Sequence, residues 1–111
     1  MECRKFEFRR NLKTGGRTEV IVVKGGKILA PTRIERSRTY SHGTDIYCLQ
    51  DWSDTIIVKL YRSNSGKLSY EIESPSEEIK RKLKNILETV SDFDEALDAV
   101  RMLFKSLPKL K

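Results

Sequence analysis

The stretch from residue 54 to residue 73, DTIIVKLYRSNSGKLSYEIE, constrains the fold more than any other part of the chain. Its first half is rich in β-branched residues, the polar segment SNSG follows, and its second half alternates polar with apolar residues. This pattern predicts a β-hairpin. The chain before the hairpin is strand-like, and the chain after it has apolar residues at helical spacing. The sequence therefore predicts an α+β fold.

The two strands of this hairpin differ in their apolar pattern. In the returning strand, Leu68, Tyr70 and Ile72 share one side, which predicts a half-buried strand. In the outgoing strand we assign Ile57 and Tyr61 to that same core side. The opposite side of the outgoing strand is also apolar, with Ile56, Val58 and Leu60. A strand that is apolar on both sides is expected inside its sheet, with a cover on each face.

The first part of the chain also predicts strands. Residues 3–10 place Phe6 and Phe8 on one side, residues 17–24 contain four consecutive apolar residues, and the loop 11–16 is expected to join the two as a hairpin. Gly25-Gly26 predicts a two-residue hairpin turn. Residues 32–40 have many charges and few apolar residues, so they are expected to form an edge strand or a surface arm.

Two helices are predicted at the C-terminal end, over about residues 75–90 and 92–107. Ser74-Pro75-Ser76-Glu77 resembles a capping box, and Ser91 or Asp92 is expected to cap the second helix. The predicted architecture is an antiparallel β-meander of five to six strands over residues 2–73, with both helices packed on one face. The chain of 111 residues is expected to form a single domain, residues 1–111. One face of such a sheet would remain open.

Several classes of protein are disfavoured by composition. The longest apolar runs are far shorter than the roughly 20 residues that cross a bilayer, so no membrane partner is expected. Charges occupy the start, MECRKFEFRR, where a signal peptide would be apolar, which predicts a cytoplasmic protein.

Cys3 and Cys48 are expected to be reduced, with a disulfide between neighbouring strands as the alternative. A single histidine leaves no Cys/His zinc set, so neither a metal nor a cofactor is predicted. The single glutamine beside abundant Lys and Glu is typical of thermophiles.

Positive charge is concentrated near the start of the chain. The net charge is +6, and residues 1–42 alone hold eleven Lys or Arg against four Glu, a balance of +7. Such a concentration indicates nucleic acid first and an acidic protein next as partners. We therefore predict a small, basic, non-enzymatic protein that binds RNA or single-stranded DNA.

The predicted nucleic-acid-binding residues are cationic, aromatic or imidazole side chains of the first 42 residues. They are Arg33, Arg36, Arg38, Tyr40, His42, Lys5, Arg9, Arg10 and Arg17. The first three arginines are expected to hold phosphates, because guanidinium groups bind phosphate with two parallel hydrogen bonds. Four aromatic residues that the pattern does not force into the core could stack on bases: Tyr40, Tyr47, Trp52 and Tyr61.

Two alternatives remain open. The first is a homodimeric interaction module that uses the open sheet face and binds an acidic protein; its interface would contain Val20, Val22, Ile56, Val58 and Leu60. The second is a metal-free ribonuclease with His42 as acid, Glu35 as base and arginines that stabilise the transition state. A histidine beside a glycine is more often a plain turn residue, and the sequence contains no catalytic motif, so a non-enzymatic role is favoured.

Overall fold

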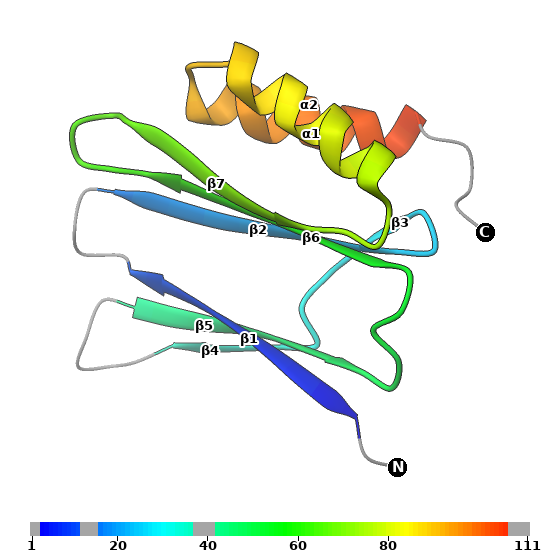
Figure 1. Ribbon diagram of the computed structural model, residues 1–111. Helices are drawn as coiled ribbons and strands as arrows, with labels where there is room; N and C mark the ends of the chain where they lie inside the picture. Colours follow the sequence, from blue (N-terminus) through cyan, green and yellow to red (C-terminus); the bar gives the residue numbers. More distant parts are fainter. Residues whose placement is uncertain (1–2, 12–15, 37–41, 107–111) are drawn as a thin grey trace.

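The computed structural model describes residues 3–11, 16–36 and 42–106 of the chain. Within these residues, seven strands form two antiparallel sheets, and two helices follow. The α+β class is confirmed. One sheet has four strands and the other has three. The elements are arranged in three layers, with the helices above the four-stranded sheet and the three-stranded sheet beneath it (Figure 1).

We call the four-stranded sheet the central sheet and the three-stranded sheet the outer sheet. The strand order of the central sheet is β3 (Lys27–Leu29), β2 (Arg17–Lys24), β6 (Thr55–Arg62) and β7 (Leu68–Glu73). The strand order of the outer sheet is β1 (Arg4–Asn11), β5 (His42–Leu49) and β4 (Arg33–Arg36). The helices are α1 (Glu77–Thr89) and α2 (Phe93–Ser106). The chain therefore passes between the sheets after β1, after β3 and after β5.

The larger core lies between the central sheet and the helices. Val58 and Leu60 of β6 are fully buried there, beneath Leu83 of α1 and Val100 of α2. Complete burial of one such side chain stabilises the fold by roughly 1.5–3 kcal/mol. The helical spacing of the apolar residues in both helices is explained by this contact.

The opposite face of the central sheet packs on the outer sheet. Val20, Val22 and Ile57 form a second core with Phe8 and Tyr47. The prediction of a single meander with an open face is therefore wrong, although β2 and β6 are covered on both faces as their apolar pattern indicated. The five residues of the predicted dimer interface are all buried inside the protein: Val20, Val22, Ile56, Val58 and Leu60.

The predicted pairing of the first strand is also wrong. β1 pairs with β5, where Phe6 lies opposite Tyr47, and β2 pairs with β6, where Ile21 lies opposite Val58. The alternation of apolar and polar residues in β1 is compatible with β2 or β5 as its partner, because it indicates only that one side of β1 is buried. The pairing was assigned from the short loop, and the actual partner lies far along the chain.

The predicted hairpin of β6 and β7 is present, with a register that differs from the prediction. Val58 lies opposite Ile72 and Leu60 opposite Tyr70, so these four side chains face the helices together. Ile57 and Tyr61 consequently face the outer sheet, not the core side we assigned to them. The turn sets this register, because Ser63 N donates to Lys67 O (2.9 Å) and Gly66 N donates to Ser63 O (2.9 Å).

The remaining turn and cap signals are largely confirmed. Gly25 and Gly26 have φ values of 59° and 81°, as a two-residue hairpin turn of type I′ requires. Asp92 caps α2 by accepting a hydrogen bond from Glu95 N (3.2 Å). The cap of α1 is Ser76, which accepts from Ile79 N (3.3 Å), and not Ser74 as the capping-box pattern predicted.

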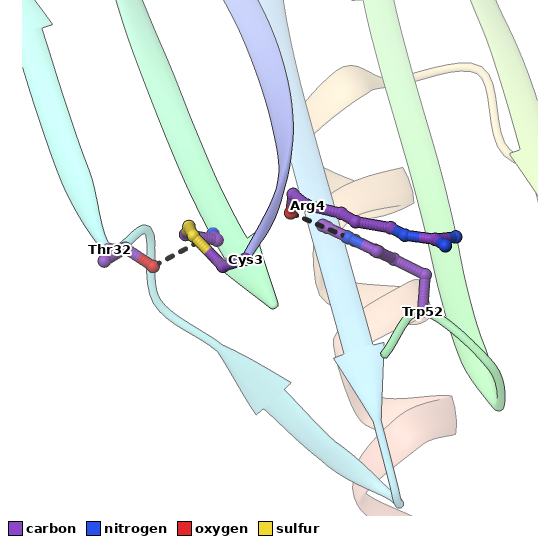
Figure 2. Close-up of a disulfide and its surroundings, with 5 residues drawn as sticks. Cys3, Arg4, Thr32 and Trp52 are labelled. Atoms are coloured by element: carbon purple, nitrogen blue, oxygen red, sulfur yellow. Dashed lines mark hydrogen bonds between the residues drawn. A yellow bond between two sulfur atoms is a disulfide. The ribbon is translucent and has the colours of Figure 1, made fainter. Parts of the chain in front are cut away.

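A disulfide joins Cys3 to Cys48, with their Cα atoms 5.4 Å apart (Figure 2). The prediction of reduced cysteines is wrong, and the alternative of a bridge between neighbouring strands describes the structure. The bridge lies where the start of β1 meets the end of β5, and Cys48 N donates to Thr32 Oγ1 (3.1 Å) beside it. Across the described residues, neither helix is long and apolar enough to span a membrane.

Candidate nucleic-acid interface

The arginines predicted to hold phosphates do not all lie on one surface. Arg33 and Arg36 are both exposed on β4, but their side chains project to opposite faces of the outer sheet, since they are three residues apart. Arg33 also forms an ion pair with Glu35 (3.3 Å). Arg38 and Tyr40 lie outside the described residues. His42 belongs to β5, and its side chain is likewise outside the described part.

Arg10 and Arg17 have structural roles. Arg10 binds Asp45 through its Nη2 (2.6 Å) and Glu19 through its Nη1 (3.1 Å), and the Asp45 carboxylate is almost completely buried. This arrangement links β1 and β5 of the outer sheet to β2 of the central sheet. All three guanidinium nitrogens of Arg10 therefore donate to these two carboxylates, and an incoming phosphate would have to compete with them.

Arg17 is held against α2. Its Nη1 contacts Asp94 Oδ1 at 2.6 Å, and its guanidinium carbon lies 4.8 Å from the centre of the Phe93 ring. This side chain fixes the start of α2 over the central sheet. Of the remaining predicted cations, Lys5 and Arg9 are exposed on β1, where Glu7 lies between them on the same face. The described members of the predicted set thus belong to several separate surfaces.

Two of the predicted stacking residues already make contacts within the protein. Tyr47 is 3% exposed between the sheets, and burial, reinforced by the nearby Asp45 carboxylate, raises its pKa to about 12. Tyr61 donates its hydroxyl hydrogen to Glu71 Oε2 (2.8 Å), and burial together with this bond raises its pKa to about 12. Trp52, in contrast, is only partly buried and lines a hollow.

That hollow, which we call the Trp52 cleft, has a volume of about 350 Å³. Residues from β1, β6, β7 and the connection between β5 and β6 line it. They are Arg4, Lys5, Phe6, Trp52, Thr55, Ile57 and Glu73. The cleft therefore opens where one end of the outer sheet meets the central sheet.

Aromatic and cationic groups meet at the Trp52 cleft. The Phe6 and Trp52 rings contact each other edge to face, with centres 5.9 Å apart, and Lys59 Nζ lies 5.3 Å from the centre of the Phe6 ring. Trp52 Nε1 donates to Arg4 O (2.9 Å), which fixes the indole against β1. Figure 2 shows the Arg4 side chain extended alongside Trp52. One hollow thus offers an indole surface with Arg4 beside it and Lys59 next to Phe6, whereas the Lys5 side chain extends from the opposite face of β1.

Sequence reasoning identified only part of this site. Trp52 and Lys5 were among the predicted residues, but Phe6 was assigned to the core, and Arg4 and Lys59 were not selected. A signal for Lys59 was present, because it interrupts the apolar run of β6 between Val58 and Leu60. A lysine at such a position indicates a place where the sheet face is not fully covered.

The predicted ribonuclease residues do not gain support from the described part of the chain. Glu35 is exposed and paired with Arg33, and the His42 side chain is not described. The described residues also contain no group of three or more His, Cys, Asp or Glu side chains that could hold a metal ion. Comparisons with protein families, with curated proteins and with solved structures found no match.

Proposed function

We propose that this protein binds single-stranded nucleic acid, RNA or DNA, at the Trp52 cleft, without catalysing a reaction. The observation that carries this proposal is the meeting of Trp52, Phe6 and Arg4 at one hollow, with Lys59 Nζ next to the Phe6 ring. It replaces the arginine patch expected from the sequence. We retain a cytoplasmic location as a prediction; an intracellular disulfide would agree with a thermophilic source.

The chemistry of the Trp52 cleft suits an unpaired strand better than a duplex. Stacking of a base on an aromatic side chain contributes roughly 1–3 kcal/mol, and every base has a face that can stack. Bases of a duplex are already stacked, and a hollow of about 350 Å³ is far too small for a double helix. Arg4 and Lys59 would neutralise phosphates on either side of the stacked base and release their counterions.

Trp52 is the only tryptophan in the chain, so it reports directly on its own cleft. A single-stranded oligonucleotide should quench Trp52 fluorescence on binding at about 50 mM salt, and the affinity should fall linearly with salt on logarithmic axes. No binding at this salt concentration, or binding that leaves Trp52 fluorescence unchanged, would contradict the proposal.

Charge variants locate the binding. Arg4→Glu should weaken binding strongly and reduce the salt dependence. Lys67→Glu is the matched control, because Lys67 is exposed beside the turn at the other end of the β6–β7 hairpin and the change in net charge is identical. Equal loss in both variants would indicate attraction by net charge alone and would remove the Trp52 cleft from the proposal.

A further inference from the structure

The Trp52 cleft meets a second hollow of about the same volume, 350 Å³. The two hollows share Ile57 and Glu73, so they adjoin at the end of β7. We call the second hollow the β7 groove. Its other lining residues are Lys59, Tyr70, Glu71, Ile72, Lys80 and Lys84.

The β7 groove follows the edge of the central sheet. In the described residues β7 pairs only with β6, so its other edge is not covered by a strand. The lining includes Glu71 and Glu73 from one face of β7 and Tyr70 and Ile72 from the other. The groove thus wraps around this edge and reaches α1, which lies above β7 in Figure 1.

Two lysines of α1 stand over the β7 groove. Lys80 and Lys84 are four residues apart, which places them on the same side of the helix, one turn from each other. The neighbouring Lys82 lies on a different side and pairs with Glu78 (3.7 Å). The positive and negative charges of α1 as a whole nearly cancel. The side of the helix that faces the groove, in contrast, presents two lysines.

The balance of charge along both hollows is positive. Their lining contains five cations, namely Arg4, Lys5, Lys59, Lys80 and Lys84, and two carboxylates, Glu71 and Glu73. A third carboxylate, Glu88, lies close to Tyr70 and raises the pKa of its hydroxyl, after the larger effect of burial. Glu71 already accepts the hydrogen bond from Tyr61, which draws it toward β6. The combined hollow suits a polyanion.

We infer that a single strand bound at the Trp52 cleft continues into the β7 groove, where Lys80 and Lys84 bind its phosphates. This inference rests on the proposed function and extends it, because it makes the site longer than one stacked base. Trp52 then holds a base at one end of the site, and α1 holds the backbone at the other end.

The α1 helix provides its own control for this inference. The test compares Lys80→Ala/Lys84→Ala with Arg81→Ala/Lys82→Ala, since both double variants remove two positive charges from the same helix and only the first pair lines the groove. Affinity for an eight-nucleotide single strand is measured by Trp52 fluorescence over a salt series. Circular dichroism on both variants checks that the helices remain folded.

We expect the Lys80→Ala/Lys84→Ala variant to lose several-fold in affinity and its logarithmic salt slope to fall by about 1.4, because each phosphate contact on a single strand contributes about 0.7. The Arg81→Ala/Lys82→Ala variant should keep the wild-type slope. A dinucleotide has a single phosphodiester group, next to the base that stacks on Trp52, so it should bind both variants equally.

The outcomes separate the two proposals. If the wild type quenches with the eight-nucleotide strand but the two double variants bind it equally, the role of Lys80 and Lys84 is wrong and the Trp52 cleft remains supported. If the dinucleotide is affected as strongly as the longer strand, the extended path is wrong as well. If the wild type binds neither strand, the proposed function itself fails.

Discussion

The central sheet and the outer sheet are built from similar strands but are buried very differently. The central sheet has helices on one face and the outer sheet on the other, and Val22, Val58 and Leu60 are completely inaccessible in it. The outer sheet buries Phe8 and Tyr47 on one face, while Lys5, Glu7 and Arg33 on its other face are exposed. The central sheet therefore provides most of the apolar burial, and the outer sheet depends on additional links.

Three kinds of contact stabilise the outer sheet. Phe8 and Tyr47 bury apolar surface against the central sheet, Arg10 links Asp45 to Glu19 across the two sheets, and the Cys3–Cys48 bond joins β1 to β5 within the outer sheet. Each can be removed separately, so the contrast between the sheets can be measured. We expect changes in the central sheet to unfold the whole protein and changes in the outer sheet to have graded effects on its stability.

The largest effect is expected from Val58→Asp. It places an unpaired charge at a fully buried position, and we expect a loss of more than about 4 kcal/mol in the free energy of unfolding. Ile34→Asp on the outer sheet is the control, because Ile34 is 56% exposed and its replacement should change stability by at most about 0.5 kcal/mol. Urea denaturation measures both. Similar losses in the two variants would contradict the contrast between the sheets.

The second largest effect is expected from loss of the disulfide. Cys3 and Cys48 are separated by 45 residues, and the chain-entropy treatment of a loop of this length gives up to about 4 kcal/mol. Denaturation of the Cys3→Ser/Cys48→Ser variant should therefore occur at lower urea than that of the oxidised wild type. Reduced wild type should behave like the variant. Identical midpoints with and without reductant would show that the bridge does not stabilise the outer sheet.

A smaller effect is expected from Asp45→Asn. The carboxylate is 2% exposed and contacts Arg10 at 2.6 Å, so its neutralisation should cost about 1–3 kcal/mol. Glu19→Gln should cost less, because the Glu19 side chain is 19% exposed and its contact with Arg10 is longer, at 3.1 Å. The same urea measurement tests the order of the two effects, and a reversed order would contradict our assignment of the stronger link.

The smallest effect concerns alkaline pH. The pKa of Tyr47 is raised to about 12 in the folded protein, above the usual value of 10.0, so the folded state holds this proton more tightly than the unfolded state does. The corresponding stability is complete below pH 10 and is lost as pH rises toward 12. Tyr47→Phe should flatten this loss by at most about 1.4 kcal/mol per pH unit. Denaturation at pH 9 and at pH 11.5 tests the prediction, and an unchanged pH dependence would contradict it.

Local sequence patterns predicted much of the fold. The helices were placed to within a few residues because their apolar spacing and the Asp92 cap are local signals. Gly25-Gly26 specified its turn for the same reason, since both residues require positive φ. The charged strand after Pro31 is an edge strand, β4, as its composition indicated.

Long-range pairing could not be predicted in the same way. Apolar residues on both sides of β2 and β6 indicated a cover on each face, but nothing local identified the second cover as a sheet made of β1, β5 and β4. The side assigned to Ile57 was wrong because the register depends on the hydrogen bonds of the turn from Ser63 to Lys67. A shift by one residue in a strand exchanges its two faces.

The candidate site was predicted in part for a related reason. Trp52 was selected because the apolar pattern does not force it into the core, while Phe6 was indistinguishable from a core residue. Lys80 and Lys84 were not among the predicted residues, because only the packing of α1 on β7 reveals which side of the helix meets the groove. Nucleic-acid binding itself remains a proposal.

The order of the strands also affects how the protein is made. β1 leaves the ribosome before its partner β5, with the central strands β2 and β3 and the edge strand β4 emerging between them. We expect Phe6 and Phe8 to stay exposed to solvent until β5 has been synthesised. Pairing between strands that are distant in the sequence is also slow to form. We expect the outer sheet to assemble late, with oxidation of Cys3 and Cys48 as one of the last events of folding. If β1 failed to pair with β5, its unpaired edge and its apolar side chains would be exposed to other chains. A chaperone would be most useful if it shielded β1 at that stage.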